Sequence, residues 1–251
     1  MKFNLIEDNQ KHSLETLVGL YEYGEFMESI NTMIDLGCGD GKDLLWWANA
    51  VSNDDRRSPL NIDCYGIDLN PELPFKNNNK NLTYISGDFE GSFHVPDIKY
   101  DVLWSHDSFQ FCQNPFNTLI KWHNMTSEGG MLALVVPQTT NFYQRTQQFE
   151  LASHSMFHYT LVNLIHLLAM AGWDCKSGFF LKRVDDPWIH AIVYKGTHGP
   201  QNPKKTSWYN LQELKVLPDS ADASVQKHGY LKQHDLLLPW IDRNLYMMSK
   251  Q

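Results

Sequence analysis

Short apolar runs alternate along the chain with longer stretches whose apolar residues recur at helical spacing. The runs at residues 32–36, 64–68, 82–86, 100–105 and 131–137 predict β-strands, and the stretches at 42–51, 115–122 and 161–173 predict helices between them. Strands that alternate with helices in this way form a sheet that is parallel at its centre. Two further apolar runs, at 179–183 and 189–194, predict two strands after the last helix. The chain therefore reads as an α/β protein.

Two segments flank this α/β core. Residues 10–30 carry Leu14, Leu17, Val18 and Tyr21 at helical spacing, which predicts an amphipathic helix that packs on the sheet edge or closes over a ligand. Residues 197–251 begin with a linker rich in Gly and Pro and continue with an apolar content that argues against disorder. We expect an N-terminal helical segment at 1–30, a main domain at 31–196 and a C-terminal extension at 197–251. The extension packs on the domain or on a partner subunit, so a homodimer is left open.

The turn after the first predicted strand carries the strongest chemical signal. Asp35 is followed by Gly37, Gly39 and Gly41 at alternate positions, with Cys38 inside the turn. Such glycines let the backbone turn sharply and let a ligand approach the main chain, where the first N–H groups of the next helix are unpaired. The spacing lacks the third glycine of a dinucleotide fingerprint, and no Walker ending follows. The turn therefore predicts a nucleotide-type ligand of another kind.

Acidic residues follow the next two predicted strands. Asp68 ends the second strand and is followed by Leu69. Because the carboxyl ends of neighbouring strands face the binding crevice of a doubly wound sheet, Asp68 is placed to accept hydrogen bonds from a ribose diol. Asp88 and Phe89 follow the third strand and offer an acceptor beside an aromatic surface, which suits an adenine. The alternatives are a solvated carboxylate at Asp68 and a turn residue that caps a helix at Asp88.

Composition narrows the partners. The formal net charge of -8 argues against nucleic acid, since proteins that bind phosphate backbones concentrate Lys and Arg on one face. The four cysteines are widely spaced and include no C-x-x-C pair, which is typical of reduced core residues. The N-terminus shows no apolar signal stretch, and no run is long enough to span a bilayer. We expect a cytoplasmic protein with no membrane partner.

The Asp-x-Gly-x-Gly-x-Gly turn resembles the first motif of class I S-adenosylmethionine-dependent methyltransferases. The block from Ser105 to Phe111, the following helix and the Glu128–Met131 approach to the next strand look like the small-molecule branch called type 11 or ubiquinone-biosynthesis-like, and residues 30–195 match roughly. The resemblance implies a Rossmann-like, doubly wound, seven-stranded sheet that is mostly parallel with an antiparallel closing pair. It also implies S-adenosyl-L-methionine as the cofactor and a small-molecule methyl acceptor. By position, these residues would hold the cofactor: Asp35, Gly37, Cys38, Gly39 and Gly41 around the methionine part, Asp68 and Leu69 at the ribose, Asp88 and Phe89 at the adenine, and Ser105 beside the sulfonium.

Residues for the acceptor are less sharply indicated. A general base is needed where the acceptor is a hydroxyl or a protonated amine, and the candidates are His106, then His154 and His158. Five aromatic residues are candidates for the acceptor pocket: Phe109, Phe142, Tyr143, Phe157 and Tyr159. For the last four, core or lid packing is the alternative. His154 and His158 are four apart, as helical metal ligands can be, but the acid of a His-Glu-x-x-His site and a third ligand are missing, so no metal is expected.

The predicted function is transfer of a methyl group to an O, N or C atom of a small molecule. Three alternatives stay open. The first is a dehydrogenase or other dinucleotide enzyme, which Lys42 and the closing strand pair disfavour. The others are a catalytically silent S-adenosylmethionine-binding module, and an RNA methyltransferase, which the acidic composition disfavours.

Overall fold

The computed structural model describes residues 30–50, 59–69, 80–91, 98–138, 156–182 and 188–232. The helix predicted at 10–30 and the candidate residues Phe142, Tyr143 and His154 lie outside these ranges. The chain divides into two compact units, residues 1–108 with 125–133 and residues 109–124 with 134–251, and each is described by itself.

Among the described residues the strands form one seven-stranded sheet in the order β3-β2-β1-β4-β5-β7-β6. In chain order they are β1 (Thr32–Leu36), β2 (Asp63–Asp68), β3 (Leu82–Ser86), β4 (Tyr100–His106), β5 (Thr126–Pro137), β6 (Trp173–Lys182) and β7 (Trp188–Lys195). The sheet is mostly parallel and ends in an antiparallel pair, as predicted.

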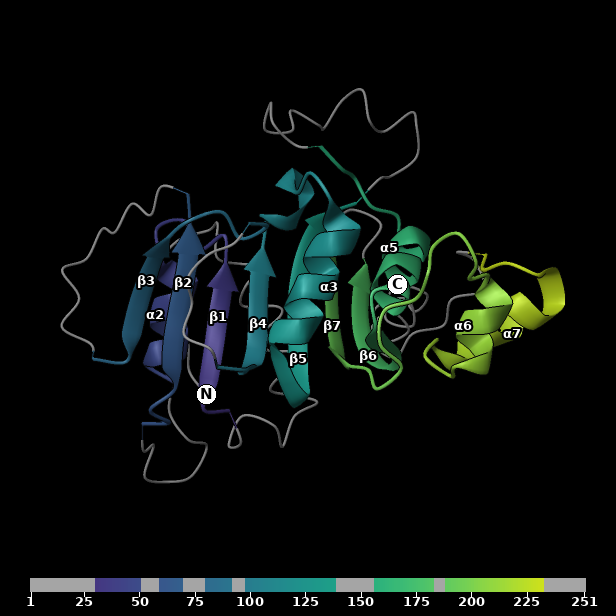
Figure 1. The fold of residues 1–251 in the computed structure, drawn as a ribbon. Helices are drawn as coiled ribbons and strands as arrows, with labels where there is room; N and C mark the ends of the chain where they lie inside the picture. Colours follow the sequence, from purple (N-terminus) through teal and green to yellow (C-terminus); the bar gives the residue numbers. More distant parts are fainter. Residues whose placement is uncertain are drawn as a thin grey trace, which may run out of the picture. The chain divides into compact units, whose positions relative to one another are not determined.

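The first unit places β1 at the centre of four parallel strands. Asp35 pairs with Gly66 of β2 on one side and with Trp104 of β4 on the other. Met33 and Ile34 point to opposite faces and are both fully buried, which explains why β1 is a continuous apolar run. Figure 1 shows β3, β2, β1 and β4 side by side with their arrowheads at the same edge. The residues that follow these strands therefore gather at one edge.

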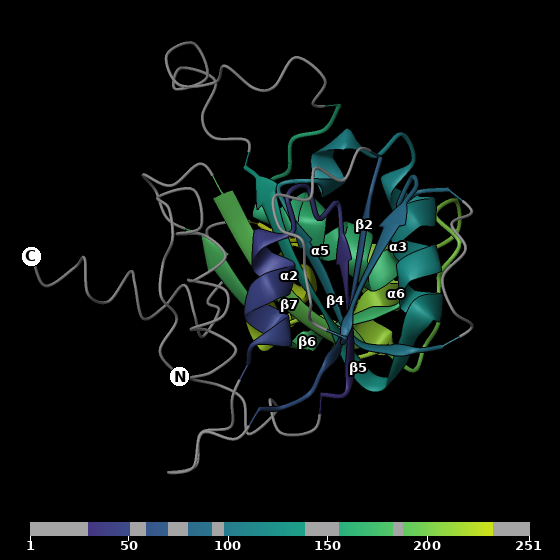
Figure 2. The same ribbon diagram turned by 90° about the vertical axis from the view of Figure 1, so that its left-hand side faces the viewer.

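Helix α2 (Lys42–Ala48) covers one face of these strands, as Figure 2 shows. Its buried side chains are Leu44, Trp46 and Trp47. Trp47 meets Trp104 of β4 edge to face, with ring centroids 5.4 Å apart. Aromatic pairs of this kind add about 0.5–1.5 kcal/mol to the burial of their area. This packing holds the last turn of α2 against β4.

The second unit contains the closing strands and the remaining helices. These are a 3-10 helix η3 (Phe109–Phe111), α3 (Pro115–Met125), α5 (Leu161–Met170), α6 (Trp208–Glu213) and α7 (Asp219–His228). A capping box begins α5, in which the Thr160 side chain accepts from the Asn163 N–H and the Asn163 side chain accepts from the Thr160 N–H. β6 and β7 pair from Trp173 with Lys195 to Lys182 with Ile189, with an irregularity between Asp174 and Phe179. Within the described ranges, none of the helices combines the length and the apolarity needed to cross a bilayer.

Several predicted boundaries were wrong. The strand predicted at 179–183 is β6, which already begins at Trp173, where the sequence predicted the end of a helix. The fifth strand was predicted to begin at residue 131, but β5 already begins at Thr126. The Ser127 hydroxyl lies 3.0 Å from the Tyr100 carbonyl and 2.7 Å from Asp101 Oδ1, and these contacts hold the start of β5 against β4. β4 also extends one residue further than predicted and ends at His106.

Candidate functional site

The glycine turn joins the end of β1 to α2 and is anchored on β2. Gly37, Gly39 and Gly41 have positive φ angles of 90°, 50° and 75°. The N–H groups of Gly37 and Cys38 both donate to the Ile67 carbonyl, at 2.8 and 3.0 Å. Only glycine adopts three such conformations at low cost, so the alternating glycines of the sequence are required by the backbone.

The three glycines have different surroundings. A Cβ atom on Gly37 would lie 2.7 Å from Ser108 Oγ and closer still to Ser108 Cβ, and one on Gly41 would lie 2.5 Å from the Tyr84 hydroxyl. A Cβ atom on Gly39 would meet no described atom within 4 Å. Gly37 and Gly41 are therefore needed for packing, whereas Gly39 faces open space in which a ligand can approach the main chain.

Asp68 lies beside this open position. Its Oδ2 atom accepts from the Gly39 N–H at 3.0 Å, which brings the end of β2 and the turn together. The next residue, Leu69, is 64% exposed and presents a large apolar surface at the same strand end. A carboxylate beside an exposed apolar side chain can bind a ribose and one face of an attached base.

Cys38 and Phe89 also flank the turn. The Cys38 side chain is buried, and a Cβ on Gly66 of β2 would lie 2.9 Å from its sulfur. Burial, followed by the negative charges of Asp35 and Asp68, raises the pKa of the Cys38 thiol far above its usual value. The half-buried Phe89 ring approaches the turn, with Cε1 3.5 Å from the place of a Cβ on Gly37. Cys38 therefore faces the protein interior, and only its backbone is left for a ligand.

Asp88 forms a turn. Its Oδ1 atom accepts from the Glu90 N–H at 2.9 Å, and its carbonyl accepts from the Gly91 N–H at 2.9 Å. Its side chain is nevertheless exposed, so binding of an adenine amine by this carboxylate stays a prediction.

Ser105 belongs to a buried chain of hydroxyl groups. Ser108 Oγ donates to the Leu36 carbonyl at 2.6 Å and lies 2.8 Å from Ser105 Oγ. Because the Ser108 hydrogen goes to Leu36, Ser105 is the donor to Ser108. Ser105 is fully buried, so its hydroxyl ties the end of β4 to the end of β1. The sequence analysis missed Ser108, and the only signal was its spacing of three from Ser105.

His106 is held by two side chains that the sequence analysis also missed. Its ring stacks on Trp104 with centroids 4.0 Å apart, and its Nδ1 lies 3.6 Å from Asp43 Oδ2. The same Asp43 oxygen accepts from Trp104 Nε1 at 2.9 Å. Asp43 stands in the first turn of α2. An imidazole oriented by a carboxylate in this way has the arrangement of a general base.

Asp35 is a buried acid next to the glycine turn. It is 3% exposed and lies one residue before the end of β1. Burial, and then the negative charges of Asp43, Asp68 and Asp40, raise the pKa of its carboxyl well above the usual value. Strongly shifted groups next to a binding turn are candidates for a functional role.

The predicted acceptor residues that the structure describes lie in the second unit. Phe109 and Tyr159 are buried and stack on each other at 5.6 Å, and Phe109 also contacts Trp122 at 5.3 Å. These contacts give both residues the core-packing role that the sequence left as the alternative for Tyr159. Phe157 is 36% exposed, and His158 is half-buried. Their part in acceptor binding stays a prediction.

No group of three His, Cys, Asp or Glu side chains in the described ranges could hold a metal ion. All four cysteines are buried and free of disulfide bonds.

Known proteins share this architecture. Residues 34–134 match the family described as "Methyltransferase domain". A protein of Listeria monocytogenes that is described as an S-adenosylmethionine-dependent methyltransferase superposes with a TM-score of 0.53 at 16% identity, over 73% of this chain and 99% of that one. The Burkholderia thailandensis 1,6-didemethyltoxoflavin-N1-methyltransferase, solved with 1,6-didemethyltoxoflavin and S-adenosylhomocysteine, superposes with a TM-score of 0.50 at 12% identity, over 78% and 93%.

A chain of the complex between a Haloferax volcanii methyltransferase activator and its methyltransferase superposes with a TM-score of 0.51 at 15% identity, over 77% of this chain and 99% of that one. No curated protein sequence matches the chain significantly. At these identities the solved structures establish the fold. The part of the chain that matches the family contains the glycine turn and the strands around it. Residues 34–134 therefore resemble the methyltransferase domain family, and the chain has the Rossmann-like fold of the solved S-adenosylmethionine-dependent methyltransferases.

Proposed function

We propose that the protein binds S-adenosyl-L-methionine at the glycine turn and transfers its methyl group to an O, N or C atom of a small molecule. The observation that carries the proposal is the open space at Gly39, which is bordered by the Asp68 carboxylate. A backbone that a ligand can approach, next to an acid at the end of the neighbouring strand, is what a nucleoside-containing cofactor requires.

The residues present fit this cofactor. Asp68 would accept hydrogen bonds from the ribose hydroxyls, and the exposed Leu69 and the Phe89 ring would border the adenine. Asp35, a buried acid beside the turn, would face the positively charged methionine part. When bound, S-adenosylmethionine supplies a methyl group that is already activated by the positive charge on its sulfur.

The chain's own task is then mainly to position the acceptor. Holding two reacting groups in line can contribute roughly 7–11 kcal/mol in well-oriented reactions. Where the acceptor carries a proton, His106 would accept it, with the ring fixed by Asp43 and Trp104. A general base of this kind contributes about 10²–10⁴-fold.

Two features support a small-molecule acceptor. The acidic composition, with a formal net charge of -8, disfavours a nucleic acid substrate. The Burkholderia relative, which has the same fold, was solved with a small heterocyclic molecule, 1,6-didemethyltoxoflavin.

The cofactor assignment is tested by comparing Asp68→Asn with Asp63→Asn. Both residues lie on β2, but Asp63 is exposed at the opposite end of the strand. Losing a charged hydrogen bond costs about 1.5–3 kcal/mol, so Asp68→Asn should weaken S-adenosylmethionine binding by roughly 10–100-fold in calorimetry. Asp63→Asn should bind like the wild type. Equal affinity of the two variants would show that Asp68 does not bind the cofactor.

Catalysis is tested separately, with methyl-labelled S-adenosylmethionine and a panel of small hydroxyl, amine and carbon acceptors. Labelled product formed by the wild type and reduced in His106→Gln would support the proposal. Tight cofactor binding with no turnover across the panel would favour the silent binding module.

A further inference from the structure

Four carboxylates surround the glycine turn, and three of them are compensated. Asp40 Oδ2 pairs with Lys42 Nζ at 2.8 Å, and Asp43 Oδ2 accepts from Trp104 Nε1. Asp68 Oδ2 accepts from the Gly39 N–H. Each of these three carboxylates therefore has a donor within the protein that stabilises its negative charge.

Asp35 is the exception. The Asp35 side chain is only 3% exposed, yet no side chain or N–H group in the described part of the chain donates a hydrogen bond to its carboxylate. The charges that act on it come from Asp43, Asp68 and Asp40, and all three are negative. An ionised carboxylate that is buried without a partner is strongly unfavourable, and such a group takes up a proton instead.

The elements packed around Asp35 provide no described cation to offset this charge. Its strand neighbours are Gly66 on β2 and Trp104 on β4. Lys42 is engaged with Asp40, and His106 lies against Asp43. The thiols of Cys38 and Cys64 are buried and uncharged, since burial raises the pKa of each.

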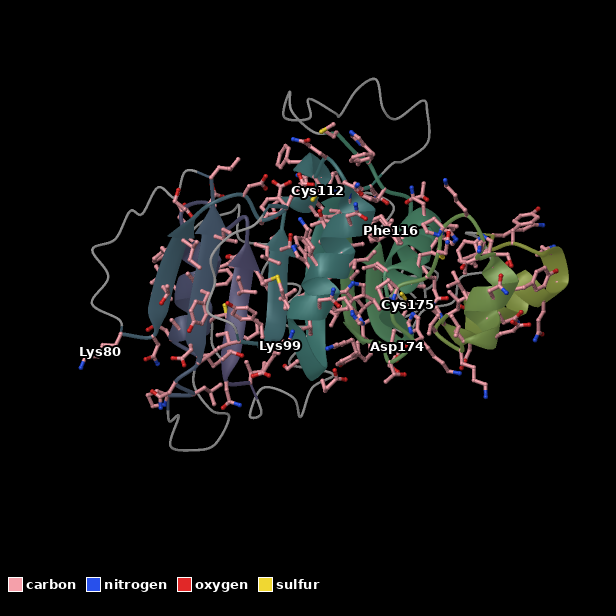
Figure 3. The ribbon with its side chains drawn as sticks, viewed as in Figure 1. Lys80, Lys99, Cys112, Phe116, Asp174 and Cys175 are labelled. Carbon is pink, nitrogen blue, oxygen red and sulfur yellow. The ribbon has the colours of Figure 1, made fainter. Side chains whose placement is uncertain are left out.

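Two other lysines of this unit lie at the far edge. Lys80 precedes β3 and Lys99 precedes β4, at the amino ends of the strands and opposite the turn (Figure 3). The described part of this unit therefore offers no cation beside Asp35, and a cationic ligand would supply one.

We propose that Asp35 selects for a cationic cofactor and gives up its proton when that cofactor binds. This inference rests on the proposed function. In the free protein the Asp35 carboxyl holds a proton, and on binding the O–H bond breaks, the proton passes to the buffer and the carboxylate stays beside the positive charge of S-adenosylmethionine. The positive charge that activates the methyl group would thus also stabilise the ionised Asp35 and favour binding of the cofactor.

A direct consequence is a pH-dependent affinity. Because the bound state holds one proton fewer than the free state, the cofactor Kd should fall as pH rises. The fall reaches at most about tenfold per pH unit while Asp35 is protonated in the free protein, and it ends once Asp35 is ionised without cofactor.

The test is calorimetry of S-adenosylmethionine binding in phosphate and in Tris, whose ionisation enthalpies differ, at several pH values. The proposal expects proton release by the wild type that Asp35→Asn abolishes. The matched control Asp40→Asn, which removes a compensated acid of the same turn, should keep most of the release. Wild-type binding with no proton release, or equal release by Asp35→Asn, would overturn the proposal.

A second ligand keeps the test decisive if Asp35→Asn fails to fold. 5′-Methylthioadenosine has the same nucleoside but carries neither the sulfonium nor the amino acid charge. It should bind the wild type without releasing a proton. Equal proton release by both ligands would refute the idea that the positive charge of the cofactor displaces the Asp35 proton. Failure of S-adenosylmethionine to bind at all would instead contradict the proposed function.

Discussion

Replacing Gly37 by alanine should destabilise the fold far more than replacing Gly39. Both glycines have positive φ, so either substitution costs about 1–2 kcal/mol of backbone strain. At Gly37 the new methyl group would also overlap Ser108, whose Oγ would lie 2.7 Å away. Ser108 cannot move aside freely because it donates to the Leu36 carbonyl at 2.6 Å. Overpacking of this kind typically costs a further 1–3 kcal/mol or so, which gives about 2–5 kcal/mol in all for Gly37→Ala.

Urea unfolding of the two variants measures the difference directly. Gly39→Ala, with no described atom within 4 Å of its methyl group, reports the strain alone. It should lose about 1–2 kcal/mol of the free energy of unfolding but bind S-adenosylmethionine poorly, because the methyl group occupies the open space. The two substitutions therefore separate stability from binding within one turn.

A double variant isolates the contact. Ser108→Gly removes the two atoms that the new methyl group would overlap, so combining it with Gly37→Ala should recover part of the lost stability relative to the sum of the single variants. The reasoning is refuted if Gly37→Ala and Gly39→Ala lose equal free energies of unfolding, or if the double variant is simply additive.

Two further predictions concern buried polar groups. Ser108→Ala leaves the Leu36 carbonyl without its hydroxyl donor and should lower the free energy of unfolding by about 1–3 kcal/mol in urea, whereas an unchanged value would contradict the hydrogen bond. Burial lowers the pKa of His123, more than the hydrogen bond to the Gly196 carbonyl raises it, so the unfolded state binds the proton more tightly. Stability should therefore be full above pH ~6.5 and fall as pH drops below that value. His123→Gln should reduce this loss between pH 5 and 7, as thermal unfolding at each pH would show, and an identical pH profile would refute it.

Much of the fold follows from the sequence because the strands are short apolar runs, and the central strands β1 and β4 are buried along most of their length. β1 and β3 have the predicted bounds, since their apolar runs end at glycine-containing turns. The placement of Asp68 beside the turn also follows, because parallel strands bring their carboxyl ends to one edge. β5 was predicted too short because its start depends on hydrogen bonds from Ser127 to residues of another strand, and no local pattern records them.

The partners of the site residues could not be predicted for a similar reason. In the sequence, Asp43 is an ordinary acid in the first turn of a predicted helix, where its negative charge interacts favourably with the helix dipole. Its contacts with Trp104 and His106 arise only when α2 packs on β4. Spacing along the chain says which residues share an edge, but side-chain geometry decides which of them are paired.

That distinction changes what the first motif means. In the sequence the acid and the three glycines form one motif, yet in the structure these residues have different surroundings. Gly37 and Gly41 leave room for Ser108 and Tyr84, whereas no described atom fills the space beside Gly39. Asp35 likewise differs from Asp40, because a lysine compensates only the latter. Gly39, which is open, and Asp35, which is buried without a cationic partner among the described residues, are the two positions that a cationic nucleoside ligand would stabilise under our proposal.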